Sequence, residues 1–255
     1  MNTVILGILM VFLAVLAAVA GLLVVQWLTS SSVRREHNDV AGFIYAVLGV
    51  AYAVLLAFLV IAVWERFEAA RGAAEHEGNE LAGIYWLANS FPGSKRHQVQ
   101  ELARSYARVV VDEEWPLMAE AQTSPKAWAL MDQLRDSIQN FEVSTSAEQV
   151  LYAQSLTQVN ALQESRRVRL LDANTYVPTI LWAILISGGV ITVGFTYLFG
   201  LERTWTHVIM VVALTVVIVS TLFTIYALQY PFAGEPLVTP DALELDLQWF
   251  EGNQE

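Results

Sequence analysis

Long hydrophobic blocks alternate with polar segments along this chain. Four stretches of at least 24 residues contain no Asp, Glu, Lys or Arg: Thr3–Leu28, Ala41–Trp64, Val177–Gly200 and Thr206–Gln229. A helix needs about 20 residues to cross the roughly 30 Å hydrocarbon core of a bilayer. The first block has no basic segment before it and is too long for the core of a signal peptide, so we expect it to be a true span. The pattern predicts four transmembrane helices.

The second block passes directly into charged sequence. Ala41–Trp64 is followed by Glu65-Arg66-Phe67-Glu68-Ala69-Ala70-Arg71, with no proline or turn signal at the junction. We therefore expect one continuous helix that crosses the membrane and projects into water. Glu65, Arg66 and Arg71 would lie on this extension, where charges three residues apart form ion pairs along the helix.

The middle of the chain has helical periodicity and clear boundary signals. A first helix continues to Asn89, the run Phe91-Pro92-Gly93-Ser94 reads as a turn with Ser94 as N-cap, and a second helix covers Lys95–Ala121 with a kink at Pro116. Further helices are expected from Ser124-Pro125 and from Ser146. The predicted organisation is transmembrane helices in 1–64, a helical soluble region in 65–175, transmembrane helices in 176–230 and a C-terminal segment in 231–255.

Composition supports a membrane protein and excludes several functions. The chain is 55% hydrophobic and has a net charge of −11, which argues against nucleic-acid binding. It contains no cysteine, and its four histidines lie in separate elements without metal-ligand spacing. No catalytic motif and no cofactor-binding motif is present, and Asp, Glu, Lys and Arg are missing from the spans, which argues against proton-coupled transport. We expect no enzyme, no cofactor and no metal site.

Four spans place both termini and the middle region on one side of the membrane. Arginines flanking that side outnumber those on the other by five to three: Arg66, Arg71, Arg166, Arg167 and Arg169 against Arg34, Arg35 and Arg203. The positive-inside rule then predicts that the soluble region and both termini are cytoplasmic. A cysteine introduced at Val99 is accordingly expected to react only from the cytoplasm.

Several short motifs are similar to those of a known family. Leu48–Phe58 resembles the neck helix of bacterial bestrophins, and Trp64–Arg71 follows it at the family's spacing. Pro231–Glu235 and Pro240–Leu243 resemble two C-terminal elements of the same proteins. The middle region is similar to bacterial proteins with a bestrophin-like domain, through Glu80, Tyr85, Pro92, Tyr106, Glu114-Trp115-Pro116 and Arg166-x-x-Arg169-Leu170.

This resemblance implies a homopentamer in the bacterial inner membrane, with five copies of the second span around an axial pore. The family's three constricting rings fall on Val50, Val54 and Phe58, which share one helix face and would form an apolar neck that gates by wetting. Gly49 and Ala57 would serve packing of the neck helix, with Ala57 in place of a family glycine. Small monovalent ions would permeate, and the acidic soluble region favours cations.

The resemblance also has a clear departure. Vertebrate bestrophins bind calcium with a dense acidic run, whereas Glu235–Asp241 here carries only isolated acids. Calcium needs six to eight oxygen ligands, so calcium gating is not expected.

Two alternatives to a channel remain. A non-conducting scaffold or signalling module would bind a partner through its soluble helices, with Trp115, Trp128 and Trp249 as exposed contacts. A membrane enzyme would need clustered polar groups at one membrane face. The best cluster is Glu65, Arg66, Glu68 and Arg71, which fits ion pairs on an extended helix better.

Overall fold

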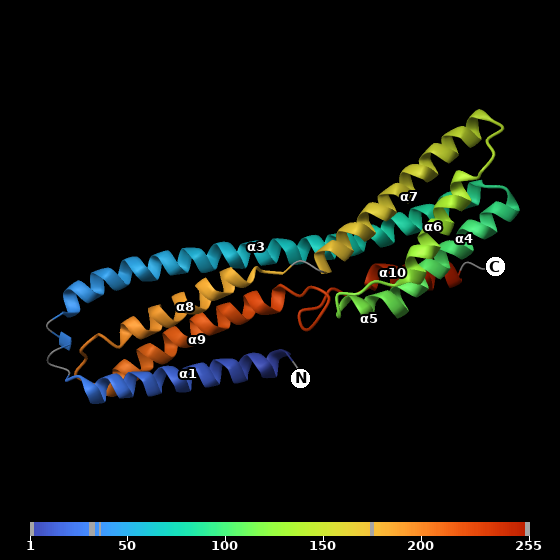
Figure 1. The fold of residues 1–255 in the computed structure, drawn as a ribbon. Coiled ribbons are helices and arrows are strands. Elements are labelled where there is room, and N and C mark those ends of the chain that lie inside the picture. The colour runs from blue at the N-terminus through green and yellow to red at the C-terminus, as the bar shows by residue number, and fades with distance from the viewer. Residues whose placement is uncertain (1–2, 31–33, 36, 174–175, 253–255) are drawn as a thin grey trace. The chain divides into compact units, whose positions relative to one another are not determined.

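The computed structural model describes residues 3–30, 34–35, 37–173 and 176–252, and within these ranges every regular element is a helix. Figure 1 shows their order. The α-helices are α1 (Thr3–Leu28), α3 (Asn38–Leu87), α4 (Gly93–Val109), α5 (Trp115–Met118), α6 (Pro125–Gln139), α7 (Ser146–Ala173), α8 (Thr179–Thr196), α9 (Thr204–Leu228) and α10 (Asp241–Gly252). A 3-10 turn (Ala88–Ser90) follows α3, and a π-helical turn (Val110–Glu114) joins α4 to α5.

The chain divides into two compact units. The first unit comprises 1–65 and 176–229, and the second comprises 66–175 and 230–255. Helix α3 contributes its N-terminal part to the first unit and the rest to the second. It runs through Trp64 and Glu65 without interruption, as the absence of a turn signal predicted.

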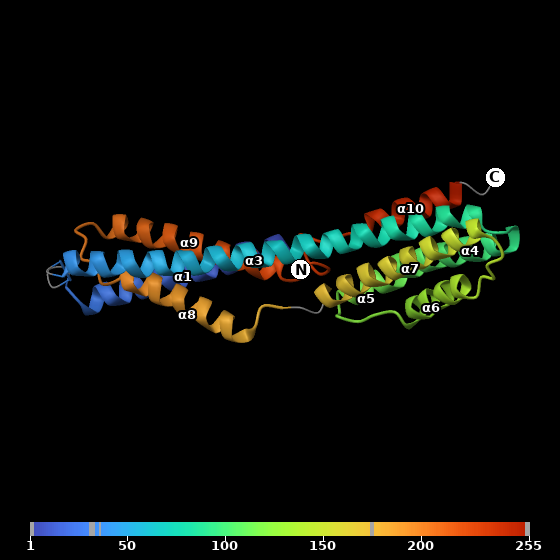
Figure 2. The same ribbon diagram turned by 90° about the horizontal axis from the view of Figure 1, so that it is seen from above.

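The first unit holds the hydrophobic helices. Four helices are long and apolar enough to cross a membrane: Thr3–Leu28, Asn38–Ser90, Thr179–Thr196 and Thr204–Leu228. Helix α1 packs along α9, and α8 packs against both (Figures 1 and 2). The four predicted spans are thereby confirmed as helices, with the third starting after Pro178, whose missing N–H suits a helix start.

Small residues on α8 make room for an aromatic side chain of α3. A Cβ added to Gly188 would lie 2.7 Å from Tyr52 Cε2, and one added to Gly189 would lie 3.0 Å from Tyr52 Oη. The Tyr52 hydroxyl donates a hydrogen bond of 2.8 Å to the carbonyl of Leu185, which fixes the ring over the two glycines. Gly194, further along the same helix, has no heavy atom within 4 Å of such a Cβ.

The second unit packs helices around the C-terminal part of α3. Helix α4 contacts α6 and α10, and α6 contacts α7 (Figure 2). Its core side chains are fully buried and largely aliphatic: Ala70, Leu81, Val99, Ala103, Leu134, Ile138, Leu162 and Leu243. In α3, α4 and α7 these positions recur at the helical spacing that predicted the helices, whereas Leu243 lies in α10, which was not predicted.

Helix boundaries in the second unit partly differ from expectation. Ser124 caps α6 as predicted, because its Oγ accepts from the backbone N–H of Ala127. Helix α4, however, begins at Gly93 after Pro92, so the prediction of Ser94 as N-cap was wrong. Thr145 caps α7: its Oγ1 accepts from Glu148 N while the Glu148 carboxylate accepts from Thr145 N, a capping box.

Pro116 follows a π-helical turn where the sequence predicted a kink. Proline has no N–H, so the carbonyl four residues earlier loses its α-helical partner. The backbone responds with a wider turn, in which Trp115 N–H donates to the carbonyl of Val110, five residues back. The turn moves Glu114 into the core of the second unit, where it is fully buried.

Candidate functional site

The three predicted neck residues lie on an exposed face of α3. Val50, Val54 and Phe58 are 65%, 48% and 71% exposed in the single chain. Tyr52 and Leu56, each 8% exposed, pack on the first unit. At about 100° per residue, these two lie on the side of the helix opposite to Val50 and Val54. The neck residues therefore face away from the helices of their own unit.

Gly49 and Ala57 make no close packing contact within the described part of the chain. Gly49 is half-buried, and a Cβ added there would meet no heavy atom within 4 Å. Ala57 is exposed. Their predicted packing role remains a prediction, and it would have to involve another copy of the chain.

The charged extension of α3 is solvent-exposed, but its ion pairing differs from expectation. Arg71 Nε lies 3.1 Å from Glu75 Oε1, four residues ahead, and the predicted pairing with Glu68 is not formed. Arg66 and Glu65 are exposed. Burial raises the pKa of Asp172 on α7, and the positive charge of Arg66 acts in the opposite direction.

A buried charge network is the most unusual feature of the second unit. Glu77 of α3, Glu114 of the π-helical turn, and Arg166 and Arg169 of α7 are all completely buried. Arg169 binds Glu77 through two nitrogens, Nε at 2.5 Å and Nη2 at 2.9 Å, and Nη2 also lies 2.8 Å from Glu114 Oε1. Arg166 Nη2 lies 2.5 Å from Glu114 Oε2. The two acids and two bases balance in charge.

Aromatic side chains enclose this buried charge network. The Tyr106 hydroxyl donates to Glu77 Oε1 at 2.6 Å. The guanidinium of Arg166 lies 4.4 Å from the ring centre of Trp128, and that of Arg169 lies 4.9 Å from the ring centre of Trp115. Burial raises the pKa of Tyr106, and the neighbouring Glu77 charge raises it further.

The electrostatics of the network explain why its charges persist. Burial lowers the pKa of Arg169, but the paired Glu77 carboxylate outweighs this and leaves the pKa above its usual value. Removing one member would leave the buried charge of the network unbalanced and away from solvent, which costs about 3–5 kcal/mol. The network joins α3, the π-helical turn and α7, so its chemistry is structural.

The network corrects one step of the sequence interpretation. Arg166 and Arg169 were counted as charges beside the membrane, yet both are buried and paired. On the opposing side, Arg34 donates to the carbonyl of Tyr197 and Arg35 pairs with Glu202. Several of the arginines counted on each side are thus paired or buried, so the five-to-three excess does not compare free charges. The cytoplasmic orientation remains a prediction.

Two other sequence expectations change. Val99 is completely buried, so a cysteine there would not report accessibility from either side. Trp115 is only 7% exposed, and its Nε1 donates to the carbonyl of Val238 at 3.1 Å, so it is a core residue. Trp128 and Trp249 are 37% and 40% exposed.

His76 is exposed, and the described residues contain no cluster of three or more candidate metal ligands.

The network was hard to recognise from sequence. The buried Glu77 stands beside the exposed Glu75 and His76, and composition does not separate them. Glu114 lies in a π-helical turn, where helical periodicity changes, and so the 3.6-residue pattern does not place it on the core face. The available signal was Arg166 and Arg169, three residues apart on one face of an otherwise mixed helix.

Comparison with known proteins agrees with this architecture. Residues 12–243 match the family model described as Bestrophin-like domain. A bacterial bestrophin homologue from Klebsiella pneumoniae, solved by zinc phasing, superposes with a TM-score of 0.69 at 15% identity, over 97% of this chain and 99% of that chain. A solved membrane-protein variant gives a TM-score of 0.73 at 15% identity over the same shares. No curated protein matches the sequence. At these identities the solved structures show the fold alone, whereas the family model spans most of the sequence. The chain therefore belongs to the Bestrophin-like domain family and has the helical fold of a bacterial bestrophin homologue.

Proposed function

We propose that this protein is an ion channel of the bestrophin type. Five copies would assemble in the bacterial inner membrane, with the second unit and both termini in the cytoplasm. Small monovalent ions would pass along the axis through an apolar neck formed by Val50, Val54 and Phe58. Family membership supports a channel, and membrane lipid would surround the first unit.

The observation that carries the proposal is the orientation of the neck residues. Val50, Val54 and Phe58 are exposed on α3, opposite the face on which Tyr52 and Leu56 pack. Large apolar side chains on a helix face that does not contact the rest of its unit must be covered either by lipid or by other copies of the chain. Rings of apolar side chains around an axis produce a dry constriction that conducts only when it wets.

The charge distribution favours cations near this pore. From Glu65 to Asp172 there are 16 acids and 11 bases, and from Tyr230 onward six acids and no base. The buried charge network removes two acids and two bases equally, so the excess of five acids in the first segment remains on accessible groups. Five copies would repeat that excess around the cytoplasmic opening of the pore, where acidic groups attract cations within about a Debye length.

The test combines stoichiometry with bilayer recording. Mass photometry of the detergent-purified protein should give a pentamer. In reconstituted bilayers, Phe58→Ala should increase single-channel conductance, because five phenyl groups, one from each copy, would be removed from the constriction. Val54→Asp should shift the reversal potential towards cation selectivity, because it would place five carboxylates in the neck. Leu55→Ala is the matched control, since Leu55 is exposed on the same helix but lies about 100° from the centre of the neck face.

The outcome separates the channel from its alternative. A pentamer in which Leu55→Ala is neutral and Phe58→Ala is not places Phe58 at the conducting path. A monomer or dimer without currents contradicts the channel and favours a scaffold that binds a protein partner. The surface favouring that alternative includes Trp86 and Trp249, which are 52% and 40% exposed with ring centres 4.2 Å apart.

A further inference from the structure

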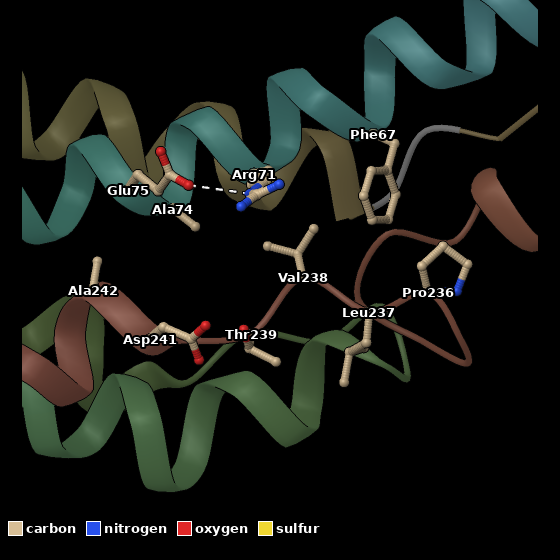
Figure 3. Close-up of a pocket in the computed structure, with 10 residues that line it drawn as sticks. All are labelled: Phe67, Arg71, Ala74, Glu75, Pro236, Leu237, Val238, Thr239, Asp241 and Ala242. Carbon is tan, nitrogen blue, oxygen red and sulfur yellow. Dashed lines mark hydrogen bonds and ion pairs between the residues drawn. The ribbon is translucent and has the colours of Figure 1, made fainter.

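The second unit contains a pocket of about 320 Å³ that the pore does not use. Figure 3 shows it between the face of α3 that carries Phe67, Arg71 and Glu75 and the segment Pro236–Ala242. A volume near 300 Å³ is the lower end of the range for small-molecule sites. The pocket has an apolar wall and a charged rim.

The charges at the rim are unequal. Arg71 and Glu75 neutralise one another through the 3.1 Å ion pair drawn in Figure 3. The Asp241 carboxylate lines the same pocket and has no hydrogen-bond or ion-pair partner among the described residues. The hydroxyl of Thr239 lies beside it. The rim therefore presents one carboxylate that has no ion-pair partner among the described residues.

The apolar wall is held in place by its own backbone. Phe67 lies on α3, and Leu237 and Val238 form the opposite side (Figure 3). Val238 N–H donates to the carbonyl of Pro231 at 2.8 Å, and its own carbonyl accepts from Trp115 Nε1. A wall fixed in this way loses little conformational entropy when a ligand binds.

We propose that this pocket binds a small organic ammonium ion with an apolar tail. The ammonium group would donate to Asp241 and Thr239, and the tail would pack against Phe67 and Leu237. An anionic ligand fits poorly, because Arg71 is already paired and Asp241 would repel it. A calcium ion fits poorly too, since it needs six to eight oxygen ligands and the rim supplies two carboxylates, one of them paired with arginine. This inference does not depend on the proposed pore.

The direct test is isothermal titration calorimetry, in which phenethylamine is titrated into the full-length, detergent-purified protein at pH 7. A ligand of this size that fits well should bind with a Kd of about 1 mM. 2-Phenylethanol, which has the same tail but no charge, should bind at least about tenfold more weakly, because a hydrogen bond to a charged group is lost.

Three variants assign the binding to this pocket. Asp241→Asn should weaken phenethylamine binding about tenfold or more, while Glu244→Gln, an exposed acid on the same helix outside the pocket, should change it by less than about twofold. Leu237→Trp should abolish binding by filling the pocket without altering charge. If Asp241→Asn also destabilises the protein, loss of binding in Leu237→Trp at unchanged melting temperature still supports the site. Equal binding of the alcohol, unchanged binding in Asp241→Asn and Leu237→Trp, or no binding up to about 10 mM would each overturn the proposal.

Discussion

At the scale of single residues, the burial of four charges distinguishes the second unit from an ordinary helical domain. Glu77, Glu114, Arg166 and Arg169 have no exposed surface, and each carboxylate contacts a guanidinium. Burying ions costs several kcal/mol each, and for Arg169 this is offset by its bidentate pairing with Glu77 and its further hydrogen bond to Glu114, whereas Arg166 makes a single hydrogen bond. Both arginines of α7 are paired in this arrangement, which ties the rotation of α7 to the positions of Glu77 and Glu114.

Glu77→Gln should destabilise the second unit by about 3 kcal/mol or more, because Arg169 would lose its bidentate partner inside the protein. Denaturant unfolding of the full-length protein in detergent, followed by tryptophan fluorescence, measures the change. The matched control is Glu75→Gln, which removes an exposed pair with Arg71 and should cost less than about 1 kcal/mol. Equal losses in the two variants would mean that the buried charges do not carry this stability.

We expect Asp246 to make the docking of α10 sensitive to pH. Its Oδ2 has no hydrogen-bond partner, and it lies 3.2 Å from the position of a Cβ on Gly78, where α10 approaches α3 closely. Burial raises the pKa of Asp246 to about 6. An unfolded aspartate has a pKa of about 3.9, so the folded unit binds more protons between these two values. Stability from this residue is present below about pH 4 and is lost as the pH rises to about 6.

Asp246→Asn should therefore remove part of the pH dependence. Between pH 4.5 and 7, ionisation of Asp246 should lower the free energy of unfolding of the wild-type protein by an amount on the order of 1 kcal/mol. The effect is small because the side chain is partly exposed. The variant should lose less over the same interval, because asparagine does not titrate. Melting temperatures at the two pH values give the comparison, and parallel wild-type and variant curves would exclude Asp246 as the source.

At the scale of elements, close helix packing depends on which glycines face a neighbour. Gly188 and Gly189 lie under Tyr52, whereas Gly194 faces open space. The three glycines lie within seven residues of one helix, and the rotation of α8 about its axis decides which of them face Tyr52. The same reasoning applies to α3, where Tyr52 and Leu56 define the packed face and thereby the face left for the neck.

Gly188→Ala should destabilise the first unit by about 1–3 kcal/mol, since the new methyl would lie 2.7 Å from the Tyr52 ring. Gly194→Ala is its control and should be neutral or slightly stabilising, because alanine favours helix and meets no neighbour there. Thermal unfolding in detergent compares the two. A Gly194→Ala variant as damaged as Gly188→Ala would point to a contact with another copy of the chain.

At the scale of the whole molecule, orientation in the membrane awaits a direct test. The chain has no cysteine, so single introduced cysteines give a clean labelling background. His97 and Arg203 are both exposed, the first on α4 and the second before α9. With a cytoplasmic second unit, a membrane-impermeant maleimide added to spheroplasts should label Arg203→Cys and leave His97→Cys unlabelled until the cells are lysed. The reverse pattern would invert the topology.

The sequence by itself determined the hydrophobic helices and most of the helices of the second unit, although it did not predict α10 (Asp241–Gly252). Uncharged blocks such as Thr3–Leu28 predict spans because hydrocarbon tolerates few charges, and this signal is local to the chain. The junction at Trp64 and Glu65 contains no residue that breaks a helix, and this local signal predicted a continuous α3. Capping by Ser124 could also be predicted, because an N-cap needs only its own turn.

Tertiary structure alone decided which side chains meet. Whether Glu77 or Glu75 is buried, whether Arg169 faces lipid or Glu77, and whether Val99 can be labelled all depend on the rotation of one helix against another. These contacts join residues up to 92 positions apart in the chain, as between Glu77 and Arg169. Local sequence carries no record of such a rotation, because packing complementarity and the balance of buried charge are properties of the assembled helices.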